Sequence, residues 1–362
     1  GMDSREFADA KQTLRERLLG LQERLNVYLA SAEYGIDANK AKKFDAWVRS
    51  HQPFHWFVEF YGIMAAGGFG VIIGNPPYVS AAKVRKAYAV KQYATQRCPD
   101  IYAWCLERVS HLAQSSGYAG MIVPLSLCFS GDFDPLRSIL YNAYRTNWFS
   151  SFGRIPSALF AHDVRVRNTI HLGSKRGDGH NYTTRLHRWF DSQRESLLSL
   201  MSYVRFNPQR WARRIPKLNT QALVDAFERA AEQKKKILSA IAPRPTKHRL
   251  FFKKTAYNWL NFCRKLPPCY DERGQAIAHT QFDELHALTE DQITALYLLL
   301  NGKLQLAFWF AIGDDFHVAK WMFVDLPVDI TRLPPDDNGT LACLAGRLES
   351  AMLGATSFKL NA

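Results

Sequence analysis

The ten residues 69–78, Phe-Gly-Val-Ile-Ile-Gly-Asn-Pro-Pro-Tyr, constrain the fold of this chain more than any other stretch. Their first six residues are a short apolar run, rich in β-branched side chains and bounded by glycine, which predicts a buried strand. The two consecutive prolines that follow fix φ at about −65° and cannot continue a ladder or a helix interior. The stretch therefore predicts a stiff loop directly after a strand, where open α/β sheets bind ligands.

The loop has groups that suit methylation of an amino group on a base. An exocyclic aromatic amine is a poor nucleophile because its lone pair is delocalised into the ring. The side-chain carbonyl of Asn75 and the backbone carbonyl of Pro76 could accept both amino hydrogens and steer the lone pair out of the ring plane. Pro76 and Pro77 would hold these acceptors without reorganisation. Tyr78 offers a flat face on which an extruded base could stack.

This stretch resembles motif IV of the N6-adenine DNA methyltransferases. Residues 54–60, followed by Gly67-Gly68-Phe69, resemble the approach to that motif in large single-chain restriction–modification enzymes of the type IIG kind. The resemblance implies that Asn75, Pro76, Pro77 and Tyr78 are catalytic, and that S-adenosylmethionine supplies the methyl group. The alternative is a proline turn after a core strand, with Tyr78 merely packed.

The resemblance continues in order to about residue 175. We expect a helix over 100–114 that is capped by Asp100, a buried strand at 117–124, a helix at 133–144, and strands at 147–153 and 167–173. The segment 159–169 resembles the family loop that closes the far side of the base pocket. Phe160 is therefore a candidate second wall for the flipped base, and the alternative is a core phenylalanine.

The part before residue 69 reads as helices, over 4–31 and 38–48. It holds no strand–Gly-x-Gly–helix unit, so the resemblance implies that the chain begins after the cofactor half of the domain. The cofactor-binding residues are unknown, and we expect the isolated chain to bind S-adenosylmethionine weakly or not at all. Without the first three strands of the family sheet, residues 69–74 should form an edge. We expect the helices of 4–48 to cover it, with a second copy or a partner chain carrying the missing half as the alternatives.

The charge balance favours a polyanionic partner, because the chain carries 47 Lys and Arg against 33 Asp and Glu. Residues 175–265 hold 21 of these basic residues and six acidic ones, interleaved with aromatics. Basic side chains suit phosphates and aromatics can stack on bases, although a solvated basic face over an ordinary core is equally compatible. Lys234-Lys235-Lys236 should end a helix that starts near Thr220. The aromatics of this segment are Trp189, Tyr203, Phe206, Trp211, Phe251, Phe252, Tyr257, Trp259 and Phe262.

The last part of the chain is again ordered. Residues 242–245 and 266–268 read as loops, and 290–310 as one helix with a break at Asn301-Gly302. The six cysteines lack CxxC pairing, and there is no metal-ligand spacing and no nuclease signature. No apolar run reaches membrane length. These features favour a cytoplasmic protein with reduced thiols, no metal site and no membrane partner.

The predicted fold class is α/β, with the second half of a Rossmann-like methyltransferase sheet and then a basic α+β target-recognition domain. The expected boundaries are a helical segment at 1–68, a partial catalytic domain at 69–176 and a DNA-binding domain at 177–362. The implied function is site-specific methylation of adenine N6 in double-stranded DNA. A DNA-binding subunit or inactive remnant is the alternative, and a methyltransferase acting on RNA or protein amino groups is a third possibility. The recognition sequence cannot be deduced.

Overall fold

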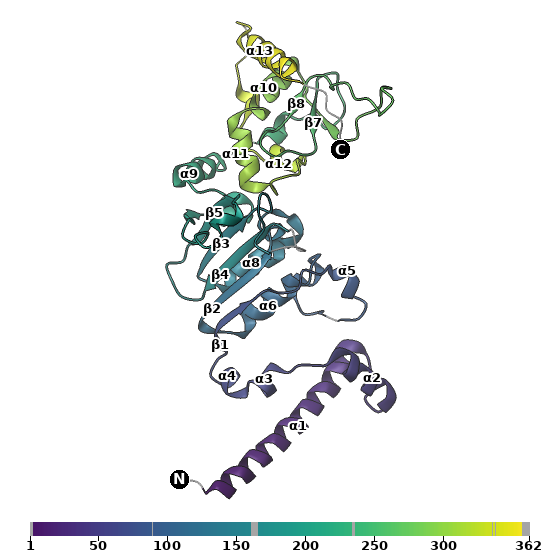
Figure 1. Cartoon of the computed structure of the whole chain (residues 1–362), viewed down its shortest axis with the longest axis vertical. Helices are drawn as coiled ribbons and strands as arrows, with labels where there is room; N and C mark the ends of the chain where they lie inside the picture. Colours follow the sequence, from purple (N-terminus) through teal and green to yellow (C-terminus); the bar gives the residue numbers. More distant parts are fainter. Residues whose placement is uncertain are drawn as a thin grey trace. The chain divides into compact units, whose positions relative to one another are not determined.

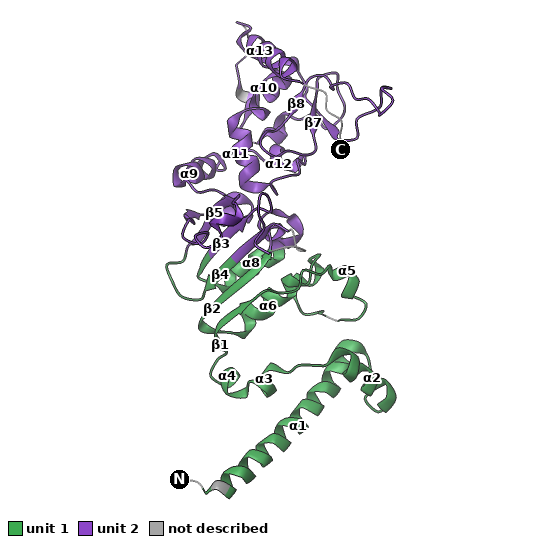
Figure 2. Ribbon diagram, in the orientation of Figure 1, with its two compact units in different colours: residues 1–123, 135–147, 171–179 green, residues 124–134, 148–170, 180–362 purple. Residues whose placement is uncertain are grey.

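The computed structural model describes residues 3–88, 90–160, 166–233, 236–334, 336 and 338–356 (Figure 1). The chain divides into two compact units (Figure 2). Unit 1 contains residues 1–123, 135–147 and 171–179, and unit 2 contains residues 124–134, 148–170 and 180–362. The chain passes between the units several times.

Helices form the first part of unit 1, as the apolar periodicity predicted. They are α1 (Ser4–Tyr34), α2 (Ala41–His51), α3 (Trp56–Glu59) and α4 (Tyr61–Ala65). At the start of α1 the Glu6 carboxylate accepts a hydrogen bond from the backbone N–H of Asp3, at 3.3 Å. The helix ends where Gly35 adopts a left-handed conformation with φ of 64°.

A mixed six-stranded sheet has the order β1-β2-β4-β3-β5-β6. β1 and β2 are parallel, whereas β5 and β6 are antiparallel. The four strands expected from the sequence are all present, as β1 to β4. The strands are β1 (Phe69–Gly74), β2 (Ala113–Pro124), β3 (Thr146–Phe152), β4 (Asn168–Ser174), β5 (Asn181–His187) and β6 (Val204–Phe206).

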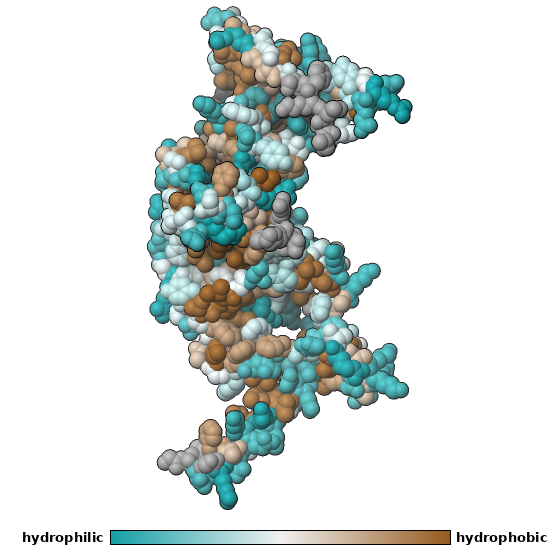
Figure 3. Space-filling model, viewed as in Figure 1, coloured by the Kyte–Doolittle hydropathy of each residue, from teal (hydrophilic) through white to brown (hydrophobic). Residues whose placement is uncertain are grey.

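β1 lies at one edge of this sheet, as predicted, but it is not buried. The side chains of Val71 and Ile73 are 58% and 80% exposed. Apolar atoms gather on the surface where Figure 1 labels β1 and β2 (Figure 3). The expectation that α1 and α2 would cover this edge is wrong. Among the short helices, Trp56 of α3 packs on Phe69 at a ring distance of 5.8 Å, which shields only the start of the strand.

The segment between β1 and β3 holds α5 (Ala81–Val84), α6 (Tyr102–Leu112), α7 (Ser126–Phe129) and α8 (Asp134–Ala143), with 3₁₀ turns at Ala94–Arg97 and Gly131–Phe133. α8 confirms the predicted helix. The predicted side-chain cap by Asp100 is wrong, because Ile101 is the N-cap residue of α6 and no side chain caps this helix. Asp100 instead forms an isolated antiparallel bridge with Ser80. α6 also stops two residues early, because the chain enters β2 at Ala113.

Unit 2 adds a three-stranded sheet of order β8-β7-β9, formed by β7 (Arg249–Lys253), β8 (Phe262–Cys263) and β9 (Phe282–His286). Its helices are α9 (Gln221–Ala230), α10 (Glu290–Leu300), α11 (Lys303–Ile312), α12 (Trp321–Val324) and α13 (Thr340–Gly354). Short 3₁₀ turns occupy Asp191–Gln193, Pro208–Trp211, Ile237–Ala240 and Ile330–Arg332. The buried ring of Phe323 joins helix to sheet, at 4.9 Å from Phe252 and 5.3 Å from Phe262.

The predicted long helix over 290–310 is two helices, because the chain bends by 65° at the Asn301-Gly302 break. In the described residues no single helix is long and apolar enough to cross a membrane, although α10 and α11 would be if taken together. α9 ends at Ala230, so the expectation that it runs to the lysine triplet is wrong. Lys234 and Lys235 lie outside the described residues, and Lys236 precedes a separate 3₁₀ turn.

Acid should destabilise unit 1 through His171. This side chain is 1% exposed, and its Nε2 lies 2.9 Å from Oδ1 of Asn147. Burial lowers the pKa of His171 to about 3. The unfolded chain therefore takes up this proton first, and stability should fall as the pH drops from about 6.5 towards 3. We expect His171→Gln to show a shallower loss than the wild type in urea unfolding at pH 7, 6, 5 and 4. The control is His111→Gln, because His111 lies on an exposed face of α6. If the wild type and both variants show the same pH dependence, His171 is not the cause of the acid destabilisation.

Candidate active site and nucleic-acid interface

The loop Asn75–Tyr78 leaves the carboxyl end of β1, as predicted. Asn75 and Pro77 are exposed, whereas Pro76 and Tyr78 are half-buried. Neither the Asn75 side chain nor the Pro76 carbonyl receives a hydrogen bond from any described residue. Two carbonyl acceptors are therefore available next to each other at the end of a strand, in a backbone that proline stiffens.

The tyrosine ties this loop to the neighbouring strand. The Tyr78 hydroxyl donates a hydrogen bond of 2.9 Å to the backbone carbonyl of Ile122 in β2. The half-buried ring is thus held at its hydroxyl end. This contact engages only the hydroxyl. The role of the Tyr78 ring as a stacking face for a base therefore stays a prediction.

Backbone contacts fix the chain on the other side of the loop. The amide of Ala81 donates to Pro99 at 2.6 Å, and the amide of Ile101 donates to Val79 at 3.0 Å. The segment that receives these contacts is itself held by Glu107. Its buried carboxylate accepts hydrogen bonds from the backbone amides of Ala94 and Thr95, at 3.0 and 2.9 Å, and from the Thr95 hydroxyl at 2.5 Å. Both ends of the loop are therefore attached to fixed backbone.

Phe160, the second residue expected to touch a base, belongs to unit 2 and is half-buried. Residues 161–165, which belong to the loop that suggested this role, lie outside the described residues. The role of Phe160 stays a prediction.

The described residues before β1 form helices and their connections, without a strand–glycine loop–helix unit that could hold S-adenosylmethionine. We therefore assign no residue of this chain to the cofactor. In the described ranges, no group of three or more His, Cys, Asp or Glu could hold a metal ion. None of the six cysteines, all of which the structure describes, forms a disulfide bond.

Many cations of the basic segment 175–265 are engaged within the protein. Lys217 is 2% exposed, and its Nζ donates to the Ala311 carbonyl at 2.6 Å. Burial lowers the pKa of Lys217 to about 8. The Nζ of Lys175 donates to the carbonyls of Ser110 and Ala113 at 2.9 and 2.7 Å. These two lysines are structural and are not candidates for phosphate contacts.

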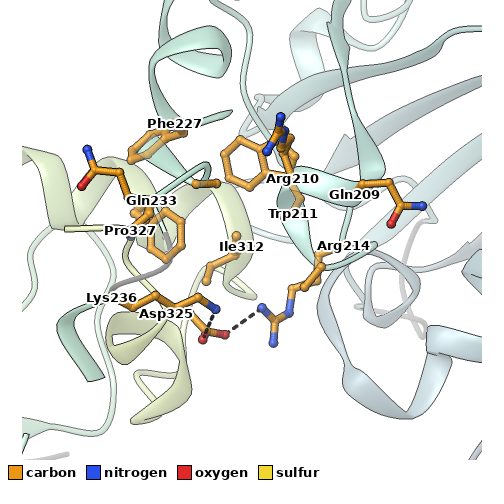
Figure 4. A pocket seen from close by; sticks show the side chains of 13 residues that line it. Gln209, Arg210, Trp211, Arg214, Phe227, Gln233, Lys236, Ile312, Asp325 and Pro327 are labelled. Atoms are coloured by element: carbon orange, nitrogen blue, oxygen red, sulfur yellow. Dashed lines mark hydrogen bonds and ion pairs between the residues drawn. The ribbon is translucent and has the colours of Figure 1, made fainter. Parts of the chain in front are cut away.

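Cations are also engaged within the protein at a hollow of about 180 Å³ in unit 2 (Figure 4). Asp325 accepts hydrogen bonds from Arg214 at 3.0 Å and from Lys236 at 2.9 Å. Burial raises the pKa of Asp325, but the bonds and charges of these two cations outweigh it, so the pKa of this carboxyl is lowered. The cations of this hollow already have their anion. The basic composition of the segment did not reveal Asp325 as the partner of these two cations.

The aromatic side chains of the segment 175–265 fall into a buried group and an exposed group. Five are buried and belong to the core, whereas others reach solvent, including Tyr257 and Trp259. Only the exposed ones remain candidates for stacking on a base. The buried five are Trp189, Phe206, Trp211, Phe252 and Phe262.

The part of the chain that contains the candidate loop is similar to known proteins. Residues 8–156 match the model of a family described as Eco57I restriction-modification methylase. Over 90 residues the chain is 34% identical to a protein of Methanocaldococcus jannaschii named "Putative type II restriction enzyme and methyltransferase RM.MjaORFECS2P". This match covers 25% of the chain and 8% of that relative, so the chain spans a small part of its length.

Comparison with solved structures finds partial, low-scoring matches, among them two restriction–modification enzymes. The Type IIL restriction-modification enzyme MmeI in complex with DNA has a TM-score of 0.43 at 9% identity, covering 80% of this chain and 50% of that chain. The LlaGI Type ISP restriction-modification enzyme, a nuclease-deletion mutant with a DNA substrate mimic, has a TM-score of 0.33 at 16% identity, covering 41% and 18%.

Removing the Tyr78 hydroxyl should weaken the attachment of the loop. We expect Tyr78→Phe to lower the free energy of unfolding by about 1 kcal/mol, the usual net contribution of one hydrogen bond. Urea unfolding measures this change. Tyr118→Phe is the matched control, because Tyr118 lies exposed on the same strand, β2, and makes no described hydrogen bond. Equal losses in the two variants would mean that the Ile122 contact does not hold the loop.

Proposed function

We propose that this chain is the methyl-acceptor part of a DNA adenine-N6 methyltransferase of a restriction–modification system. The observation that carries the proposal is the loop Asn75–Tyr78, whose two adjacent carbonyl groups are free of described partners at the end of β1. The family match over residues 8–156 includes this loop and supports a methylase role. The adenine specificity rests on the motif alone.

In the proposed mechanism, Asn75 and Pro76 act on the amine of an extruded adenine. The Asn75 side-chain carbonyl and the Pro76 backbone carbonyl accept the two amino hydrogens, which turns the nitrogen lone pair out of the ring plane. Because the prolines fix the backbone, the acceptors need no reorganisation as positive charge develops on nitrogen. Tyr78 packs its ring against the base. The proton can leave after the charge has formed, so no general base is required.

S-adenosylmethionine would supply an electrophilic methyl group, and we propose that residues outside this chain hold it. The edge of β1 supports this division. Val71 and Ile73 are exposed on an edge strand beside a mainly apolar hollow of about 570 Å³, whose lining includes Trp56 and Trp104. An exposed apolar edge favours pairing with another strand. We propose that a strand of the cofactor-holding part, in the same polypeptide or in a partner, adds to β1.

A DNA-binding subunit without methyltransferase activity is the second candidate. The observation that favours it is the helical structure of the described residues before β1, which offers no cofactor cradle. Methyl transfer to DNA, measured with the cofactor-holding part present, separates the two candidates.

Asn75→Ala should abolish methylation and leave DNA binding nearly unchanged. The assay is transfer of a labelled methyl group to DNA, in the full-length protein or with the cofactor-holding part supplied as a partner. Asn75 acts on the amine in the transition state and does not contribute to phosphate contacts. Asn39→Ala is the control, since Asn39 is also an exposed asparagine of unit 1 but lies far from β1 in sequence. Wild-type activity in Asn75→Ala would remove the catalytic assignment.

Binding of duplex DNA should weaken steeply with salt, because we expect its contacts to be mainly between Lys or Arg and phosphate. Fluorescence anisotropy between about 50 and 200 mM salt covers the range in which proteins with several phosphate contacts lose orders of magnitude in affinity. An affinity that does not change over this range would show that the chain has no phosphate-binding face.

A further inference from the structure

Unit 2 has a second hollow, of about 560 Å³. Unlike the hollow in Figure 4, it contains cations that are not paired with a described anion. Three arginines lie beyond the ends of neighbouring strands and converge on it. Arg154 follows β3, Arg167 precedes β4 and Arg188 follows β5. Its volume is within the range of about 300–1,000 Å³ that is usual for ligand sites. The remaining lining residues are Ile155, Pro156, Phe190, Tyr257, Asn258 and Asp315.

Backbone hydrogen bonds hold the segments that carry these arginines. The amide of Gly153 donates to the His187 carbonyl at 2.9 Å, and the amide of Ser157 donates to the Trp189 carbonyl at 3.1 Å. These bonds flank Arg154. The carbonyl of Arg167 accepts a hydrogen bond from Leu125 at 2.8 Å. The two side chains therefore start from fixed positions.

Arg188 and the two acidic residues nearby are already paired. Arg188 forms an ion pair with Asp315, and its guanidinium also donates to the Asn258 side chain at 2.9 Å and to the Tyr257 carbonyl at 2.8 Å. Asp314 accepts hydrogen bonds from the backbone amide and the ring Nδ1 of His317, at 2.7 and 2.5 Å.

The side chains of Arg154 and Arg167, by contrast, have no hydrogen bond or ion pair with any described residue. Both are half-buried, and the Nε of Arg167 is fully buried without a partner. An unpaired donor in a partly buried cation is costly, so such a group is expected to have a ligand. Burial lowers the pKa of Arg167, as does the charge of Arg154, while the charge of Asp314 opposes the change.

We propose that Arg154 and Arg167 bind a phosphodiester group of a nucleic-acid strand. Guanidinium groups present forked donors that match phosphate oxygens, and two of them supply the charge that a phosphate needs. Tyr257 and Phe190 also line this hollow and are 51% and 63% exposed, so their rings are candidates for contact with the adjoining sugar and base. This inference rests on the proposed function in so far as DNA is the partner, and it does not involve the loop Asn75–Tyr78.

The double variant Arg154→Gln/Arg167→Gln tests the site. Fluorescence anisotropy with a labelled duplex should show at least a tenfold greater loss of affinity than in the control Arg185→Gln/Arg244→Gln. The control removes the same two charges from exposed arginines of unit 2 whose side chains make no described hydrogen bond. The slope of log K against log salt should fall by about two, one for each arginine that no longer neutralises phosphate charge. The single variant Arg154→Gln should show about half of this change in slope, and it leaves the buried Nε of Arg167 in place should the double variant fail to fold.

Three outcomes overturn the inference in distinguishable ways. If the wild type binds DNA and the test variants lose no more affinity than the control, the site is not a phosphate site, whereas the proposed function stands. If the wild type does not bind DNA at all, the inference and the DNA substrate of the proposed function fall together. The third arm titrates dAMP. Arginine-dependent binding of dAMP, with DNA affinity unchanged, would make the hollow a mononucleotide site.

Discussion

The buried carboxylate of Glu107 holds the backbone on which the candidate active site depends. A buried carboxylate must be paired or saturated with hydrogen bonds, and here two amides and a hydroxyl from Ala94 and Thr95 provide them. Those bonds fix the turn before Pro99, and Pro99 in turn receives the amide of Ala81. Together with the Tyr78 hydroxyl on β2, this arrangement leaves the Asn75 and Pro76 carbonyls on rigid backbone without a hydrogen bond from any described residue. Rigidity of this kind allows acceptors to act on a substrate without reorganisation.

Some of the basic side chains of this protein stabilise its fold, and others are available to a ligand. A net charge of +14 describes a tendency to meet polyanions, but it does not say which cations are available. Burial determines that, because a cation removed from water needs a partner within the protein. Lys217 finds a backbone carbonyl, and Arg214 and Lys236 share Asp325. The side chains of Arg154 and Arg167 have no such partner among the described residues, and they are the cations for which we propose a ligand.

The elements of the sheet could be predicted because their signals are local. The apolar run at 69–74 and the runs that became β2, β3 and β4 each carry their own periodicity and glycine boundaries. The errors arose where a neighbour competes. Asp100 has a cap residue's chemistry, but its pairing with Ser80 leaves Ile101 at the start of α6. The helix pattern after Thr220 extends through Lys236, yet α9 stops at Ala230. The sequence also did not reveal that Val71 and Ile73 are exposed. An apolar strand has the same sequence pattern whether or not a second layer of the fold covers it.

The sequence by itself determined the strand and the stiff loop after it, since these depend on residues adjacent in the chain and on the fixed φ of proline. It is also the source of the chemistry that we propose for Asn-Pro-Pro-Tyr. It also determined that the protein is strongly basic. Only the tertiary structure decided which of the basic residues are free, because ion pairs join residues as distant as Arg188 and Asp315. It also decided where the hollow with two unpaired arginines lies, since Arg154 and Arg167 come from the ends of different strands. Pairing and burial are properties of neighbours in space, and the order of residues along a chain does not specify them.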